Sequence, residues 1–155
     1  GIELEAKAAL NENINLTAAY SYTDAEYTED TIFKGKRPAE VPRNQASLWT
    51  DYTFYDTVLS GLTFGAGVRY TGSTVSYYKN DTSTGKKNDS FNVGSYTVAD
   101  AMVKYDLARF GLPGSSVAVN VNNLFDRDYV SSCYSEYACY WGAERQVVAT
   151  ATFRF

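Results

Sequence analysis

Hydrophobic and polar residues alternate along most of the chain, and this alternation predicts β-strands. In the first ten residues the even positions are apolar, and the charged residues Glu3, Glu5 and Lys7 stand between them. After a polar turn at 11–13, the apolar positions resume at Ile14, Leu16, Ala18, Tyr20 and Tyr22. Successive side chains of a strand point to opposite faces, so a period of two gives each strand one apolar and one polar face. The first 22 residues therefore predict a β-hairpin.

The same pattern predicts five more strands. They lie at 44–55, 62–70, 95–105, 117–122 and 146–155. At 123–125 the alternation slips, which indicates a bulge or the end of a strand. Trp49, Gly65 and Gly67 fall on the polar face, where the glycines would let a neighbouring element approach closely or let the sheet bend. The pattern predicts an all-β chain with about seven antiparallel strands.

Three long polar connections alternate with three short ones. The long connections cover 24–43, 79–93 and 129–142, and the short ones cover 11–13, 56–60 and 106–114. Long loops at one rim and short turns at the other are typical of outer-membrane β-barrels, in which the long loops face outward. Connections of this length are uncommon in compact domains unless they are functional.

The alternation has two interpretations, a soluble β-sandwich and a membrane barrel. No segment approaches the roughly eighteen consecutive apolar residues of a membrane helix, but barrel strands carry only half their residues on the lipid side. The fourteen tyrosines favour a membrane–water interface, where one end of the ring is apolar and the other is wet. Single-chain bacterial barrels have an even number of strands, and a bilayer does not tolerate open sheet edges. We therefore expect a transmembrane β-barrel portion that belongs to a larger barrel.

Composition excludes several functional classes. The net charge is −4, and no basic stripe is present that could release counterions from nucleic acid, so no nucleic-acid partner is expected. The chain contains no histidine, which excludes a histidine-based catalytic triad or zinc–histidine site within it. Neither a catalytic residue nor a metal ligand is therefore assigned.

The C-terminal third carries a family resemblance. The block VNVNNLFDRDYV, followed by a strand ending in Phe155, resembles the C-terminal end of TonB-dependent outer-membrane receptors. The spacing of Cys133 and Cys139, the following WGAERQVVATATFRF and the upstream YTVADAMVKYDLARFGLPGSS look like the ferrichrome, or hydroxamate siderophore, receptor branch. The resemblance is most specific over 95–155 and holds at family level over the rest.

The resemblance implies a division of the complete protein. Large outer-membrane transporters have about 22 strands and a plugged lumen. Residues 1–155 would be the C-terminal part of such a barrel, and the plug and the N-terminal strands would lie outside this chain. The resemblance also implies a bacterial outer-membrane location and coupling to the TonB complex through an N-terminal region.

Cys133 and Cys139 lie six residues apart in the last long connection, and the chain has no other cysteine. A surface protein assembled in the periplasm is exposed to oxidant, which favours a disulfide. Two thiolates alone leave the tetrahedral coordination of a metal incomplete. Receptors of the resembled branch also carry a disulfide in their last surface loop.

Four aromatic residues crowd the same connection: Tyr134, Tyr137, Tyr140 and Trp141. They could pack the loop or belong to an interfacial belt. They could instead form an aromatic wall for a bulky, neutral, polar ligand such as a ferric hydroxamate chelate. The resembled family binds siderophores with aromatic residues above the plug, so we assign all four as candidate ligand-binding residues.

Other polar residues receive structural interpretations. The acidic cluster Asp24, Glu26, Glu29 and Asp30 lacks the ligand spacing of a calcium loop and is expected to be a solvated loop. A further set is expected to face the lumen, where its members would solvate the channel or contact the plug: Arg69, Asp100, Lys104, Asn120, Asn122 and Arg154.

The resemblance implies an outer-membrane receptor and transporter for ferric hydroxamate siderophores, with iron carried as part of the ligand and no cofactor of its own. Its further expected partners are the lipid bilayer, lipopolysaccharide, and phages or bacteriocins at the surface loops. One rival is a passive porin, which would need a complete, even-stranded barrel. The other is a barrel enzyme, for which a chain without histidine is a poor host.

Overall fold

The computed structural model describes residues 1–55, 57–78 and 89–154. Seven strands form one sheet in the order β1-β2-β3-β4-β7-β8-β11, and every neighbouring pair is antiparallel. The strands are β1 (Ile2–Ala9), β2 (Ile14–Tyr22), β3 (Asn44–Thr53), β4 (Leu62–Thr71), β7 (Tyr96–Asp106), β8 (Ser116–Asn122) and β11 (Gln146–Thr152). These are the seven strands that the alternation predicted, with ends that differ by up to three residues.

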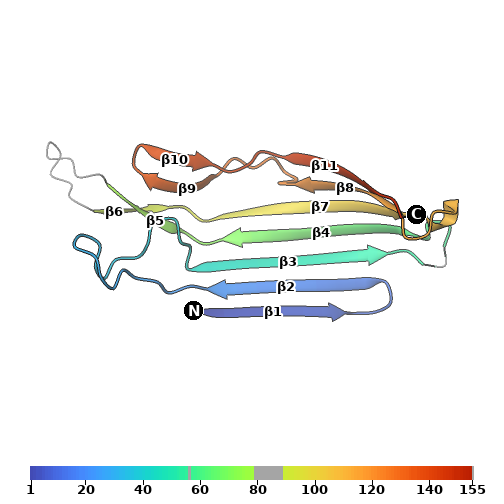
Figure 1. Cartoon of the computed structure of the whole chain (residues 1–155), viewed down its shortest axis with the longest axis horizontal. Helices are drawn as coiled ribbons and strands as arrows, with labels where there is room; N and C mark the ends of the chain where they lie inside the picture. Colours follow the sequence, from blue (N-terminus) through green and yellow to red (C-terminus); the bar gives the residue numbers. More distant parts are fainter. Residues whose placement is uncertain (56, 79–88, 155) are drawn as a thin grey trace.

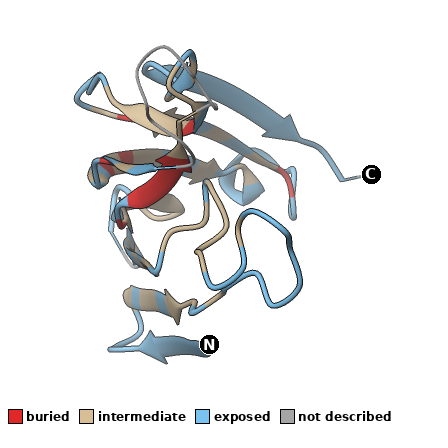
Figure 2. Ribbon diagram, turned by 90° about the vertical axis from the view of Figure 1, so that its left-hand side faces the viewer, coloured by how far each residue is buried: buried red, intermediate tan, exposed pale blue. Residues whose placement is uncertain are grey.

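The connections divide the molecule into two ends (Figure 1). The long connections all lie at one end of the seven-stranded sheet and the short ones at the other, as the sequence predicted. Figure 2 shows the sheet as a curved wall that is open on one side, with β1 and β11 at its two edges. We call the two ends the long-connection end and the short-connection end.

The strand register joins the apolar positions into one continuous face. Across β2, β3, β4 and β7, Ala18 lies opposite Leu48, Leu48 opposite Val68, and Val68 opposite Ala99. A second row runs from Val103 through Val119 to Ala149. Directly opposed residues of neighbouring strands share a face. The polar positions are therefore equally continuous on the other side.

None of the described residues covers this apolar face. Its large side chains, including Leu48, Val68 and Val147, are exposed. Among the described residues, the buried hydrophobic side chains are Val75, Val93, Val98 and Cys133, and none of them belongs to the apolar face. An exposed apolar surface of this extent marks an interaction with another apolar phase. Within the described part of the chain, no helix is long and apolar enough to cross a membrane.

Aromatic residues border the apolar face at both ends. Tyr20 and Tyr70, both in register with Ala46, lie toward the long-connection end. Tyr52 and Phe64 are register partners toward the short-connection end. From Ala46 to Tyr52 the distance along β3 is about 20 Å at ~3.4 Å per residue. An apolar band between two aromatic belts is the outer surface of a transmembrane barrel.

The long connections contain a second sheet that the sequence interpretation missed. It has four strands in the order β10-β9-β5-β6, namely β5 (Thr74–Tyr77), β6 (Ser90–Val93), β9 (Val130–Ser135) and β10 (Ala138–Trp141). The prediction of uninterrupted polar connections at 79–93 and 129–142 was wrong where β6, β9 and β10 form. These strands are short. β9 and β10 pair with each other as a hairpin, and β9 is joined to β5 by the bridge of Tyr77 with Ser135. Residues 79–88 of the same prediction, like Asp56 and Phe155, lie outside the described residues.

Candidate functional site

The β9–β10 hairpin lies at the long-connection end (Figure 1). Cys133 and Cys139 are opposed across it and form a disulfide, with 3.9 Å between their Cα atoms. This confirms the disulfide expected from the sequence. Cys133 is buried, whereas Cys139 is exposed. Among the residues that the structure describes, no cluster of metal-ligating side chains occurs.

The hairpin carries all four candidate aromatic residues. Tyr134 belongs to β9, Tyr137 to the turn, and Tyr140 and Trp141 to β10. Their exposed fractions run from 58% for Tyr140 to 80% for Tyr137. Within the described residues none of these rings stacks on another ring, and none lies on the apolar face of the seven-stranded sheet. Burial within the loop therefore does not account for them, and their assignment to ligand contact stays a prediction.

Asn123 connects the chain before and after the hairpin. It is buried, has a positive φ of 51°, and directly follows β8, so the slip in alternation marks the end of that strand. Its Nδ2 donates to the carbonyls of Arg127 at 2.9 Å and Ala143 at 3.1 Å, and its Oδ1 accepts the Arg127 N–H at 2.9 Å. Asn tolerates the left-handed conformation better than most residues. The amide thus fixes the base of the hairpin.

Asp126 adds a second connection at the same base. Its Oδ1 accepts the backbone N–H of Arg145 at 2.8 Å, and its Oδ2 lies 3.5 Å from the Arg145 guanidinium. Its φ of 54° is also positive. The sequence block around Asn123 and Asp126, which carried the family resemblance, therefore has a structural role in joining β8 to β11.

At the base of the hairpin, Tyr129 packs between Tyr96 and Gly142. Its ring stacks on Tyr96 of β7, with 4.2 Å between ring centroids. A Cβ atom placed on Gly142 would overlap the Tyr129 ring, so only glycine leaves room at that position. This contact anchors the return of the hairpin to the wall.

An ion pair on the polar face connects the wall to this base. Arg69 of β4 binds Asp100 of β7 through two hydrogen bonds, Nε to Oδ2 at 2.5 Å and Nη2 to Oδ1 at 3.0 Å. Asp100 is buried, and its Oδ1 also accepts the Asn123 N–H at 3.0 Å. Bidentate pairing fixes a guanidinium more firmly than a single contact does. The chain Arg69, Asp100 and Asn123 therefore fixes the hairpin base relative to the sheet.

The other residues predicted to face the lumen lie in two different places. Lys104, Asn120 and Asn122 share the polar face with Arg69 and Asp100 in the observed register. Arg154 lies beyond the end of β11, where its backbone N–H donates to Ser115 Oγ at 3.0 Å.

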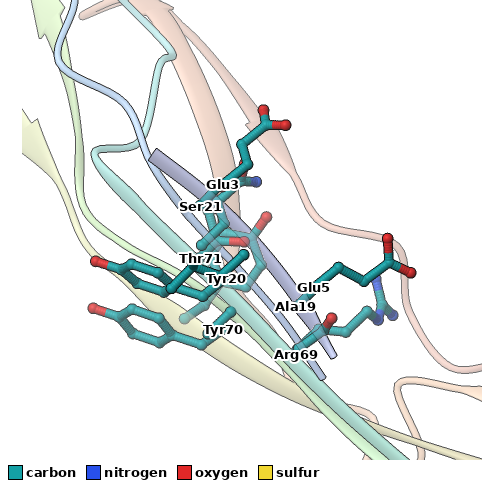
Figure 3. A pocket seen from close by; sticks show the side chains of 13 residues that line it. Glu3, Glu5, Ala19, Tyr20, Ser21, Arg69, Tyr70 and Thr71 are labelled. Atoms are coloured by element: carbon teal, nitrogen blue, oxygen red, sulfur yellow. The ribbon is translucent and has the colours of Figure 1, made fainter. Parts of the chain in front are cut away.

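The polar face also carries an open groove of about 570 Å³ near the long-connection end. Figure 3 shows Glu3, Glu5 and Arg69 on one side of the sheet, with Tyr20 and Tyr70 pointing to the other. No residue of the β9–β10 hairpin lines the groove. Sequence reasoning did not identify Glu3 and Glu5 as part of a groove. Their polar positions in the alternation are the signal that could have found them.

The side chain of Trp49 accounts for the presence of glycine at positions 65 and 67 on the polar face. Cβ atoms at Gly65 and Gly67 would collide with its indole ring. The expected close approach is thus made by a side chain of β3, the neighbouring strand.

The acidic connection at 24–43 uses its carboxylates for local contacts. Asp30 accepts the N–H groups of Ile32 and Phe33, both at 2.7 Å, and Asp24 lies 3.4 Å from Arg43. The assignment of the whole cluster to a solvated loop stays a prediction.

Comparison with known proteins agrees with this geometry. Residues 1–124 match the family described as TonB dependent receptor-like, beta-barrel. The chain is 63% identical over its whole length to the "Ferrichrome outer membrane transporter/phage receptor" of Escherichia coli K12, and 41% identical to the "Ferrioxamine B receptor" of Salmonella typhimurium. It spans about a fifth of the length of these relatives, 20% and 21% respectively.

A solved structure supports the same assignment. The pyoverdine outer membrane receptor FpvA from Pseudomonas aeruginosa PAO1, bound to pyoverdine, superimposes with a TM-score of 0.71 at 26% identity. The match covers 99% of this chain and 21% of that receptor. The wall with one apolar face, its two aromatic belts and the match over residues 1–124 agree: the chain belongs to the TonB-dependent receptor-like β-barrel family.

Proposed function

We propose that the chain forms part of the wall and a surface loop of an outer-membrane receptor that takes up ferric hydroxamate siderophores. The observation that carries this proposal is the disulfide-closed hairpin that exposes four aromatic side chains at the long-connection end. The similarity to a ferrichrome transporter and a ferrioxamine B receptor indicates the ligand class.

The hairpin chemistry suits a neutral iron chelate. A ferric trihydroxamate has no net charge at its metal centre, so it gains little from a cluster of cationic side chains. Between Val130 and Trp141 the only charged residue is Glu136. Tyr and Trp offer flat apolar rings with one hydroxyl or N–H donor each, which suits a bulky ligand that has polar edges. Iron is the cargo here and not a cofactor.

The wall has a separate role in this proposal. Its apolar face contacts lipid, and its polar face, with the groove beside Glu3, Glu5 and Arg69, lines the lumen. The plug and the segment that engages the TonB complex belong to the rest of the protein. Transport by movement of that plug, without covalent chemistry, requires no catalytic residue from this chain. Phages and bacteriocins would recognise the exposed loops at the same end.

Binding measurements on the full-length protein test the ligand assignment. We expect Tyr134→Ala and Tyr140→Ala each to weaken ferrichrome binding about tenfold, or ~1.4 kcal/mol, as loss of an aromatic contact does. Tyr55→Ala is the matched control, because Tyr55 is also exposed but lies at the short-connection end. A ferric tris-catecholate should bind more weakly than ferrichrome. Unchanged ferrichrome affinity in both hairpin variants would refute the assigned site.

A further inference from the structure

The turn at residues 107–114 exposes apolar side chains beyond the end of the strands. It lies at the short-connection end, where the chain returns from β7 to β8 (Figure 1). It contains the 3₁₀ helix η1 (Ala108–Phe110). Phe110 is 70% exposed, and Leu112 is also exposed.

Hydrogen bonds hold this turn in one conformation. Phe110 N–H donates to Leu107 O at 2.9 Å, Gly111 N–H to Ala108 O at 3.0 Å, and Leu107 N–H to Ser115 O at 2.9 Å. Gly111 has a φ of 77°, which glycine adopts without strain. The turn is longer than the other short connections because it folds into a helical turn. Phe110 is therefore presented by an ordered scaffold and not by a loose loop.

The exposed ring continues the apolar face of the wall. Phe110 contacts Tyr105, with 6.1 Å between ring centroids. Tyr105 is the register partner of Leu62 and Val117, so it belongs to the apolar face. The surface around Phe110 is thus continuous with the surface that contacts lipid.

A neighbouring turn enlarges the same exposed surface. Arg109 Nη1 donates to the carbonyl of Val58 at 2.8 Å, which joins the 107–114 turn to the connection between β3 and β4. That connection exposes Val58, at 88%, and Leu59. Ala108 and Arg109 instead line a groove on the polar side together with Thr63 and Lys104. The turn therefore has an apolar side and a polar side, as the wall has.

We propose that the 107–114 turn is a membrane anchor that inserts Phe110 and Leu112 into the phospholipid leaflet at the short-connection end. The apolar side chains contact the glycerol and upper acyl-chain region, as the apolar side of an interfacial helix does. The anchor fixes the height of the β7–β8 hairpin in the membrane beyond the strands themselves. The proposal depends on the assignment of the apolar face to lipid and not on the siderophore.

Site-directed spin labelling of the full-length protein tests this anchor. The protein is reconstituted in phosphatidylethanolamine and phosphatidylglycerol bilayers, with a nitroxide at Phe110→Cys or, as the matched control, at Ala108→Cys in the same helical turn. The native cysteines of this chain are joined in a disulfide and do not take the label. We expect the nitroxide at 110 to collide more with dissolved oxygen than with a water-soluble nickel complex, and the nitroxide at 108 to show the reverse.

Two results would overturn the proposal. Equal nickel accessibility at 110 and 108 would place Phe110 in water. Protection of position 110 from both reagents would indicate a protein partner instead of lipid. Leu112→Cys provides a second labelled site if the Phe110 variant does not fold, and it should resemble position 110. Retained heat-modifiable migration on a gel checks that each variant forms the barrel.

Discussion

The two sheets of this protein are stabilised in different ways. The seven-stranded wall has long strands in uninterrupted register, and no residue that the structure describes covers its apolar face. The four-stranded outer sheet has strands of four to six residues and two register shifts between β9 and β10. Yet it holds Val75, Val93 and Cys133, three of the four buried hydrophobic side chains in the described part of the chain.

The difference shows where each sheet obtains its stability. In a bilayer every backbone polar group must be paired, so a regular hydrogen-bonded ladder is required of the wall, and lipid covers its apolar face. Outside the bilayer the outer sheet is free to be irregular, but it must provide its own contacts. Tyr77 shows this, because its hydroxyl donates to Arg37 O at 2.6 Å and its ring lies 4.9 Å from that of Phe33.

The largest expected loss of stability comes from placing a charge on the apolar face of the wall, compared with a charge on the polar face. Ala18 and Ala19 are neighbours on β2, but Ala18 lies opposite Leu48 on the apolar face, while Ala19 lies opposite Glu5 on the polar face. We expect Ala18→Arg to destabilise the full-length protein by about 2–4 kcal/mol, as a cation does near the middle of the bilayer.

Ala19→Arg is the matched control and should have little effect, because its charge faces water and Glu5. The measurement is equilibrium denaturant unfolding in lipid bilayers. Equal losses for the two variants would contradict the assignment of the faces.

A smaller effect is expected from opening the disulfide of the outer sheet. The double change Cys133→Ser and Cys139→Ser should destabilise the β9–β10 hairpin locally by about 2 kcal/mol, since the crosslink closes a short loop. Hydrogen exchange by mass spectrometry should show faster exchange at 130–141 and unchanged exchange in β3 and β4. Ser132→Ala, in the same hairpin but outside the disulfide, is the control. Faster exchange throughout the wall would mean that the two sheets are not energetically separate.

The smallest effect is a pH dependence confined to the 24–43 connection. The N–H groups of Phe33 and Ile32 hold the pKa of the Asp30 carboxyl below its ordinary value. Because the pKa is lowered in the folded protein, this contribution to local stability is complete above the ordinary pKa of Asp and is lost as pH falls through the lowered value.

Amide exchange of Ile32 and Phe33, corrected for its intrinsic pH dependence, should therefore report weaker protection in acid. In Asp30→Asn the side-chain oxygen still accepts but does not titrate, so this acid-dependent loss should disappear. An identical loss in the variant would assign the effect to another group.

The sequence predicted the strands of the wall but only part of the structure at the long-connection end. The alternation in β1–β4, β7, β8 and β11 was sufficient because the period of two is a local property of each strand. It also placed Cys133, Cys139 and the four aromatic residues in one connection. It did not predict β5, β6, β9 and β10, because strands of four to six residues are too short for the alternation to show. Their assembly into one sheet also depends on distant segments, as in the bridge of Tyr77 with Ser135.

By itself, the sequence determined that this chain has strands with two unlike faces, because each residue type reports which environment its side chain suits. Only the tertiary structure decided how these faces join, which residues form the base of the hairpin, and that Phe110 extends the apolar face beyond β7. The sheet register, the stacking of Tyr129 on Tyr96 and the hydrogen bond from Asn123 to Ala143 each depend on the meeting of distant segments. A local pattern does not predict these contacts, because the stability of a strand depends on the neighbours that it packs against in the finished sheet.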